Sequence, residues 1–265
     1  MSSRTLKGLT VPMLALAIAA AGCGGGSKPE SSSAPAAGGA PAAAPAAAVD
    51  PASVATITGT IKLDGTAPAP DLIKMNADPV CVKEGKGGTV EFIVPGDGGT
   101  LQNVLVYVKD GLGNQSFPAP TEPVILTQKG CHYVPHVFGI MVGQPLEVVN
   151  GDPTLHNIHA IPKTNQEFNT GQPIQNMRFK HVFTAKEVMV PFKCDVHGWM
   201  NANVAVLDHP FYAVSGKDGS FTIAGLPPGK YTIEAWHEKL GVQTMEVTVA
   251  AKESKAADFT FKMAS

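Results

Sequence analysis

Cys194-Asp195-Val196-His197-Gly198-Trp199-Met200 is the stretch around which the rest of the chain can be organised. It places a thiol, an imidazole and a thioether on one short segment, with the spacing C-x2-H-x2-M. A β-rich run precedes it at residues 187–193, and another follows at residues 202–207. The segment is therefore predicted to be a loop that joins two strands at one end of a sheet.

The three side chains on this loop predict a metal site. Soft sulfur together with imidazole suits copper, and two His, one Cys and a weakly bound axial Met form the blue-copper electron-transfer set. The loop supplies three of these ligands, so one more histidine must come from elsewhere. The best candidate is His156, which lies far enough upstream for part of a β-sandwich to bring it alongside the loop. His159 is the alternative ligand, although three positions along a strand place it on the opposite face, where a surface or outer role is favoured.

A strand ending in Asn150, the His156-Asn157 pair and the Cys-x2-His-x2-Met loop together resemble a cupredoxin over roughly residues 130–207. The short loop is most similar to that of amicyanin, since plastocyanin-type loops place the Met further along. The resemblance implies one type 1 copper, with Asn157 holding the ligand loops together by hydrogen bonding. Its implied ligands are the equatorial His156, Cys194 and His197 and the axial Met200.

The same resemblance implies that electrons leave through His197, whose ring edge lies near the surface in cupredoxins. Trp199 would then lie on the docking surface for a redox partner, or it would pack over the site as a lid. Two alternatives to the copper interpretation stay open. The site is degenerate, or it binds zinc, which also accepts His and Cys.

A second resemblance lies at the end of the chain. Asp218-Gly219-Ser220-Phe221, followed by the run from Gly225 to Tyr231, resembles the signature of the carboxypeptidase regulatory-like (transthyretin-like) module. The opening strands of such a module stand far upstream, before residue 124. We therefore predict an all-β chain in which a cupredoxin-like Greek-key sandwich, residues 124–207, is inserted between two halves of a regulatory-like sandwich, residues 54–123 and 208–265. The alternative is a cupredoxin followed by an independent tail, which would have a small core.

The N-terminus predicts export. Residues 1–23 have a basic start and a short apolar run, too short for a permanent membrane span. Their end, Ala20-Ala21-Gly22-Cys23, resembles a bacterial lipobox, in which Cys23 becomes lipidated; an ordinary signal peptide is the alternative. Residues 24–53, rich in Gly, Ser, Ala and Pro, are predicted to be a disordered tether. Together they predict a periplasmic or cell-envelope lipoprotein, on the outer membrane if the organism is Gram-negative.

The remaining cysteines form an even pair. Disulfides persist in exported proteins, so Cys81 and Cys131 are predicted to be bridged. The alternative is a second metal site that uses Cys131 with His132 and His136. Two further histidines, His209 and His237, fall near predicted strand ends of the regulatory-like module and are expected to be packed or surface residues.

Composition and missing motifs exclude several functions. The net charge of −2 gives no sign of nucleic-acid binding, and 28 Gly and 22 Pro fit strands separated by turns. Helical periodicity is missing except for a turn near residues 71–77. No nucleophile elbow, P-loop, dinucleotide fingerprint or His-x-His pair occurs, so neither an enzyme nor a small-molecule substrate is predicted.

The expected function is single-electron transfer with transient protein partners, by a protein that the lipid tethers to a membrane. The alternative is a non-catalytic copper-binding or scaffold lipoprotein built on the regulatory-like sandwich.

Overall fold

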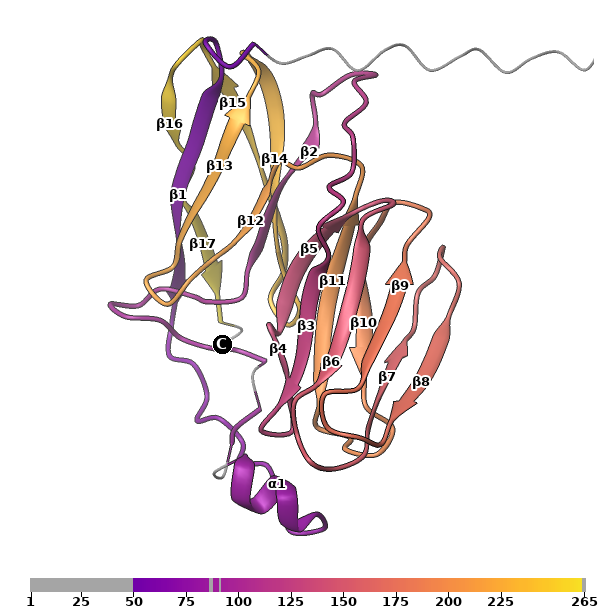
Figure 1. The fold of residues 1–265 in the computed structure, drawn as a ribbon. Helices are drawn as coiled ribbons and strands as arrows, with labels where there is room; N and C mark the ends of the chain where they lie inside the picture. Colours follow the sequence, from indigo (N-terminus) through magenta and orange to yellow (C-terminus); the bar gives the residue numbers. More distant parts are fainter. Residues whose placement is uncertain (1–49, 86–87, 91, 264–265) are drawn as a thin grey trace, which may run out of the picture. The chain divides into compact units, whose positions relative to one another are not determined.

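The computed structural model describes residues 50–85, 88–90 and 92–263. Over these ranges the chain consists of strands and turns with one short helix, which confirms the all-β fold class (Figure 1). The proposed export signal and almost all of the proposed tether lie outside the described residues. Among the residues described, no helix has the length and hydropathy needed to cross a bilayer.

The first sandwich combines strands from before residue 124 with strands from after residue 207. Its strands are β1 (Ala55–Asp64), β2 (Leu105–Asp110), β12 (Tyr212–Val214), β13 (Ser220–Leu226), β14 (Gly229–His237), β15 (Gly241–Val249), β16 (Ser254–Ala256) and β17 (Phe259–Lys262). In one sheet, β1 pairs antiparallel with β13 and parallel with β16 and β17. In the other, the order is β12-β2-β14-β15, with antiparallel pairing throughout.

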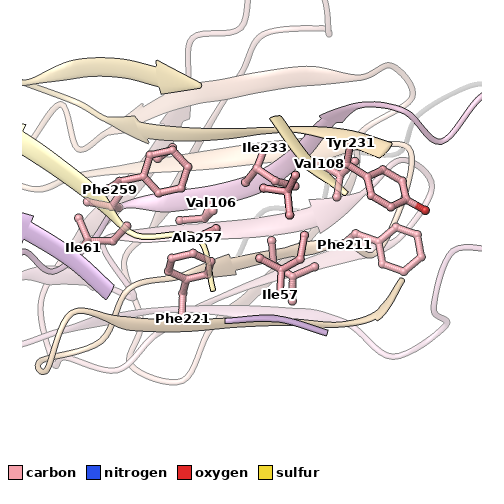
Figure 2. Packing of buried hydrophobic residues seen from close by; sticks show 14 of the residues in the cluster. Ile57, Ile61, Val106, Val108, Phe211, Phe221, Tyr231, Ile233, Ala257 and Phe259 are labelled. Atoms are coloured by element: carbon pink, nitrogen blue, oxygen red, sulfur yellow. The ribbon is translucent and has the colours of Figure 1, made fainter. Parts of the chain in front are cut away.

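Inward-facing side chains of these two sheets form the first core (Figure 2). The alternation is plain in β13, where Phe221 and Ile223 are buried between exposed neighbours, as the two-residue period of a strand requires. Each fully buried side chain of this size contributes about 1.5–3 kcal/mol. Gly59 of β1 is needed for close packing, because a Cβ there would lie 2.2 Å from the carbonyl oxygen of Ala257.

The second sandwich is formed by the strands between these two segments. They are β3 (Val124–Lys129), β4 (His132–Val134), β5 (Val137–Met141), β6 (Pro145–Asn150), β7 (His156–Ala160), β8 (Phe168–Gln172), β9 (Arg178–Val182), β10 (Glu187–Lys193) and β11 (Asn201–Leu207). One sheet has the order β5-β11-β10-β7-β8, and the other has the order β4-β3-β6-β9. The core between them includes Leu126, Val148, Ile158, Phe192 and Val204.

A third, smaller cluster of buried residues draws on both sets of strands. It contains Leu105 and Tyr107 of β2 together with Val137 of β5 and Ala205 and Leu207 of β11. Strands of both sandwiches therefore share this apolar cluster.

The helix α1 (Pro79–Glu84) lies just beyond the turn predicted at residues 71–77. Asp78 caps it by accepting hydrogen bonds from the backbone N–H groups of Val80 and Cys81, and Pro79 opens its first turn. Both are standard signals for a helix start. The disulfide between Cys81 and Cys131 ties α1 to the turn between β3 and β4.

Candidate metal centre

The loop between β10 and β11 is closed by its own backbone. The N–H of Cys194 donates to the carbonyl oxygen of Met200 (3.1 Å), and the N–H of Met200 donates to that of His197 (2.9 Å). The N–H of His197 points at the Cys194 sulfur, at 3.3 Å. These bonds hold the thiol and the imidazole on the inner side of the loop, as the strand-loop-strand prediction requires.

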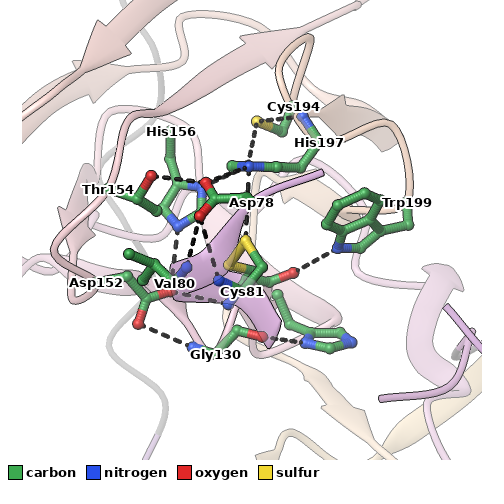
Figure 3. The surroundings of a disulfide bond; sticks show 12 residues. Asp78, Val80, Cys81, Gly130, Asp152, Thr154, His156, Cys194, His197 and Trp199 are labelled. Atoms are coloured by element: carbon green, nitrogen blue, oxygen red, sulfur yellow. Dashed lines mark hydrogen bonds and ion pairs between the residues drawn. A yellow bond between two sulfur atoms is a disulfide. The ribbon is translucent and has the colours of Figure 1, made fainter. Parts of the chain in front are cut away.

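Three donor atoms converge beneath this loop (Figure 3). The Nδ1 atoms of His156 and His197 lie 3.0 Å apart, and the Cys194 sulfur lies 3.9 Å from the Nδ1 atom of His197. All of these donor atoms lie within 4.8 Å of one another. Met200, at the end of the loop, is 1% exposed. The fold thus brings His156, and not His159, to the buried sulfur.

Carboxylates hold the far nitrogen of both imidazoles. The Nε2 atom of His156 lies 3.1 Å from Oδ2 of Asp152, and that of His197 lies 3.1 Å from Oδ2 of Asp78. An ionised carboxylate only accepts hydrogen bonds, so each neutral imidazole carries its proton on Nε2 and a lone pair on Nδ1. Two lone pairs that face each other across 3.0 Å require a shared proton or a metal cation between them.

The electrostatics favour the thiolate that a metal needs. Burial raises the pKa of the Cys194 thiol, but the neighbouring His156 imidazole and hydrogen bonds from backbone N–H groups outweigh it and hold that pKa below its usual value. Burial likewise raises the pKa of Asp152, which nevertheless stays well below its ordinary value because His156, Cys131 and Gly130 donate hydrogen bonds to it. Since the thiolate is the form that binds metals, the donor set fits a soft cation.

The outer imidazole is covered, which corrects one expectation. His197 is only 3% exposed, so its ring edge does not lie at the surface. Its Nε2 atom faces Asp78 and also the sulfur of Cys81, at 3.6 Å. Trp199 packs against the same ring in a tilted arrangement, with 5.1 Å between centroids and 42° between the ring planes, and its Nε1–H donates to the carbonyl oxygen of Cys131 (3.0 Å). The chain covers this ligand because α1 and the disulfide occupy the place where solvent was expected (Figure 3).

Asn157 links the two ligand-bearing segments, in the role the resemblance implied. Its Oδ1 accepts a hydrogen bond from the backbone N–H of Asp195 (2.6 Å), and its Nδ2 donates to Asn169 (2.7 Å). His159 turns away from the sulfur and places its two ring nitrogens against Asp195 (2.9 Å) and Glu167 (2.8 Å). It therefore has the outer role favoured for it.

The structure does not bring together the alternative second site. Cys131 is disulfide-bonded to Cys81, and among the described residues Cys194 is the free cysteine. The Nδ1 atom of His132 lies 2.8 Å from the carbonyl oxygen of Gly130, while the Nε2 atom of His136 contacts Glu238. His209 and His237, which were expected to be packed or surface residues, are each 2% exposed and accept backbone N–H groups through Nδ1.

The two carboxylates that contact the imidazoles could not be identified from sequence patterns. Asp152 stands four residues before His156, but a single acidic residue in a loop carries no specific signal. Asp78 can be predicted as a helix cap from the proline after it, yet its contact with His197 spans 119 residues. Only the tertiary structure reveals either contact.

Comparison with known protein families agrees with the second resemblance. Residues 198–262 match the carboxypeptidase regulatory-like domain. This match begins inside the candidate metal loop and includes β12 to β17, whereas β1 and β2, which complete the two sheets, lie outside it. No curated protein matches the chain.

Similar solved structures include copper proteins. A copper-containing nitrite reductase from Thermus scotoductus SA-01 is 22% identical. The match covers 36% of this chain and 26% of the reductase, at a TM-score of 0.31. A Cu(I) amicyanin variant is 17% identical. The match covers 32% of this chain and 81% of the amicyanin, at a TM-score of 0.29. A purple cupredoxin from Nitrosopumilus maritimus is 29% identical. The match covers 28% of this chain and 81% of the cupredoxin, at a TM-score of 0.25. The chain thus spans about a quarter of the length of the reductase.

Proposed function

We propose that this protein binds one copper ion and transfers single electrons. The observation that carries the proposal is the meeting of two imidazole Nδ1 atoms with a buried cysteine sulfur, from His156, His197 and Cys194. With the buried thioether of Met200 on the same loop, these residues supply the ligand set of a type 1 site. Copper supplies one-electron chemistry when bound, by alternating between Cu(I) and Cu(II).

The protein's own contribution is a site that stays in place. Both imidazoles are held by carboxylates, the loop is closed by its backbone, and Asn157 ties the loop to β7. Ligands held in this way reorganise little when the metal charge changes. The N–H of His197, which donates to the sulfur of Cys194, is the kind of hydrogen bond that tunes a metal centre from outside.

The proposed route for the electron does not leave through an exposed edge of the His197 ring. Because His197 is covered, we assign the exit to Trp199, which contacts that ring at a tilt and is half-buried, beside the exposed Gly198. Transient redox partners use small interfaces, so a patch centred on Trp199 is sufficient. Replacing Trp199 by Leu is expected to slow electron exchange with small redox proteins while leaving the copper spectrum unchanged.

The first test is spectroscopic. The folded protein without its first 49 residues is loaded with Cu(II), and its visible and electron paramagnetic resonance spectra are compared with those of Cys194→Ser. We expect an intense thiolate-to-copper band and narrow hyperfine splitting, both absent from the variant. Glu84→Gln, a change on α1 at a residue outside the donor set, serves as the control and should keep both signals. A colourless protein, or one that prefers zinc, would overturn the copper proposal.

One observation favours a second candidate, a copper-binding protein without electron transfer. The cover over His197 separates the metal site from solvent, as a storage or structural site would require. Rapid, reversible oxidation by redox proteins supports electron transfer. A metal that is redox-silent toward proteins but passes to a Cu(I) chelator supports the second candidate, a non-catalytic scaffold built on the regulatory-like sandwich.

We further propose attachment to the cell envelope through Cys23. This rests on residues 1–23 alone, which lie outside the described residues. Radiolabelled palmitate should be incorporated into the wild-type chain expressed in a bacterium, but not into Cys23→Ala. Equal labelling of both chains, or of neither, would contradict a lipid anchor at this position.

A further inference from the structure

Each imidazole of the candidate centre has the same surroundings on its outer side. A carboxylate receives the imidazole N–H, and the same carboxylate receives the backbone N–H of a half-cystine. Asp78 accepts from Cys81 (3.4 Å) as it contacts His197, and Asp152 accepts from Cys131 (2.8 Å) as it contacts His156. The disulfide then joins the two halves.

Both carboxylates are fixed by further donors. Asp78 accepts the hydroxyl of Thr154 at Oδ2 (2.7 Å) and the N–H of Val80 at Oδ1 (2.8 Å). Asp152 has a fully buried side chain and accepts the N–H of Gly130 (3.0 Å). Neither carboxylate can turn away from its imidazole without losing these bonds. The geometry is therefore a property of the folded chain and does not depend on a bound metal.

We propose that Asp78 and Asp152 are positioning residues of the metal centre, and that the Cys81–Cys131 disulfide joins them into one outer frame that favours the more highly charged state of the metal. This inference rests on the proposed copper function. The frame, however, acts on the imidazoles whether or not metal is bound.

Two physical effects point in the same direction. A carboxylate that accepts the outer N–H makes an imidazole a stronger electron donor and fixes its orientation. In addition, two negative charges close to the site stabilise a divalent ion more than a monovalent one, and burial weakens solvent screening of that difference. The frame therefore lowers the tendency of Cu(II) to be reduced.

The frame also explains why a helix covers the outer ligand. Asp78 reaches His197 only because it caps α1, and α1 stays in place because Cys81 is bonded to Cys131. The residues that bury the imidazole are thus the residues that orient it.

The copper-loaded test compares Asp78→Asn with Glu84→Gln. Asn caps helices as well as Asp, so α1 should persist. Glu84 lies on the same helix, so its variant removes the same charge from a more exposed position. We expect Asp78→Asn to raise the Cu(I) to Cu(II) ratio at a fixed applied potential about tenfold, which is 59 mV for one electron. The control should change it less than about threefold, because solvent screens exposed charges. Equal shifts in the two variants would overturn the role of Asp78, and an unchanged ratio in Asp152→Asn would overturn that of Asp152.

The metal-free test separates this inference from the copper proposal. In ¹⁵N NMR spectra of the apoprotein, the neutral ring of His197 should carry its proton on Nε2. Asp78→Ser keeps a helix cap but is too short to reach the ring, so a mixture of tautomers is expected. An unchanged tautomer would sink the positioning role even if copper binds. A changed tautomer in a protein that binds no copper would leave the frame standing and remove the copper function instead.

Discussion

His197 and Asp78 lie 119 residues apart in the chain, yet the Nε2 atom of the imidazole is 3.1 Å from Oδ2 of the carboxylate. The contact joins a loop of the second sandwich to a helix that precedes it in sequence. It seals the outer ligand, and it leaves the Nδ1 lone pair facing His156. A side chain outside the loop therefore forms part of the cover over His197 and determines which of its ring nitrogens is left to bind metal.

The disulfide that holds this helix should contribute strongly to stability. Replacing Cys81 and Cys131 together by Ala removes a cross-link between residues 50 positions apart, which is worth about 4 kcal/mol in the chain-entropy account. Guanidinium unfolding should show a loss of that order. Val82→Ala, an exposed change on the same helix, should cost less than about 0.5 kcal/mol. A double variant as stable as wild type would mean that the native helix strains the bond.

Tyr133 joins β7, which begins with His156, to β10, the strand that precedes Cys194. Its buried hydroxyl contacts the carbonyl oxygens of Asn157 on β7 and Lys193 on β10. Tyr133→Phe leaves these carbonyl groups without that donor, which should cost about 1–3 kcal/mol in urea unfolding. Among the described residues the hydroxyl of Tyr212 has no hydrogen-bond partner, so Tyr212→Phe is the matched control. Equal costs for the two variants would show that the hydroxyl of Tyr133 is not stabilising.

Gly59 tests whether β1 packs between strands from the far end of the chain. A Cβ at this position would lie 2.2 Å from the Ala257 oxygen and 2.6 Å from the Phe221 ring. Gly59→Ala should therefore cost about 1–3 kcal/mol by overpacking. Gly171 lies in β8 with no atom within 4 Å of its added Cβ, so Gly171→Ala should be neutral or slightly stabilising. Thermal unfolding of both variants measures the difference, and a neutral Gly59→Ala would contradict the pairing of β1 with the C-terminal strands.

His237 should make the stability depend on pH. Burial lowers its pKa from 6.5 to about 4, so the unfolded chain binds the proton more readily than the folded one between these values. Stability contributed by the neutral ring is therefore present above pH 6.5 and is lost as the pH falls toward 4, by at most about 1.4 kcal/mol per pH unit for one proton. His237→Asn keeps an acceptor for the turn and should flatten the slope in this window. Urea unfolding between pH 4 and 7 measures it, and parallel curves would exclude the ring as the titrating group.

The candidate metal ligands could be identified in the sequence because three of them share one local spacing. Cys194, His197 and Met200 stand on one loop, where the alternation of the flanking runs already predicts two strands. His156 could be chosen over His159 because positions three apart in a strand face opposite sides. In the structure His156 meets the sulfur, and His159 meets Asp195.

The exposure of His197 could not be predicted in this way. The resemblance to cupredoxins implied a ring edge near the surface, but His197 is 3% exposed. The difference comes from α1, a six-residue helix in a segment where only a turn near residues 71–77 was expected. The cap Asp78 and the proline after it were the available signals, but such signals describe a helix start and say nothing about what the helix covers.

The sequence by itself determined what depends on neighbouring residues: the all-β character, the strand that precedes each ligand, and the chemistry of the donor set. Periodicity and spacing suffice there because the backbone places adjacent side chains in known directions. The tertiary structure alone decided which carboxylates hold the imidazoles and how deeply His197 is buried. The contact between Asp78 and His197 spans 119 residues of the chain, whereas the pairing of Cys81 with Cys131 could be predicted from the number of cysteines. The carboxylate contact depends on how whole sheets and the helix pack, which a local pattern cannot encode.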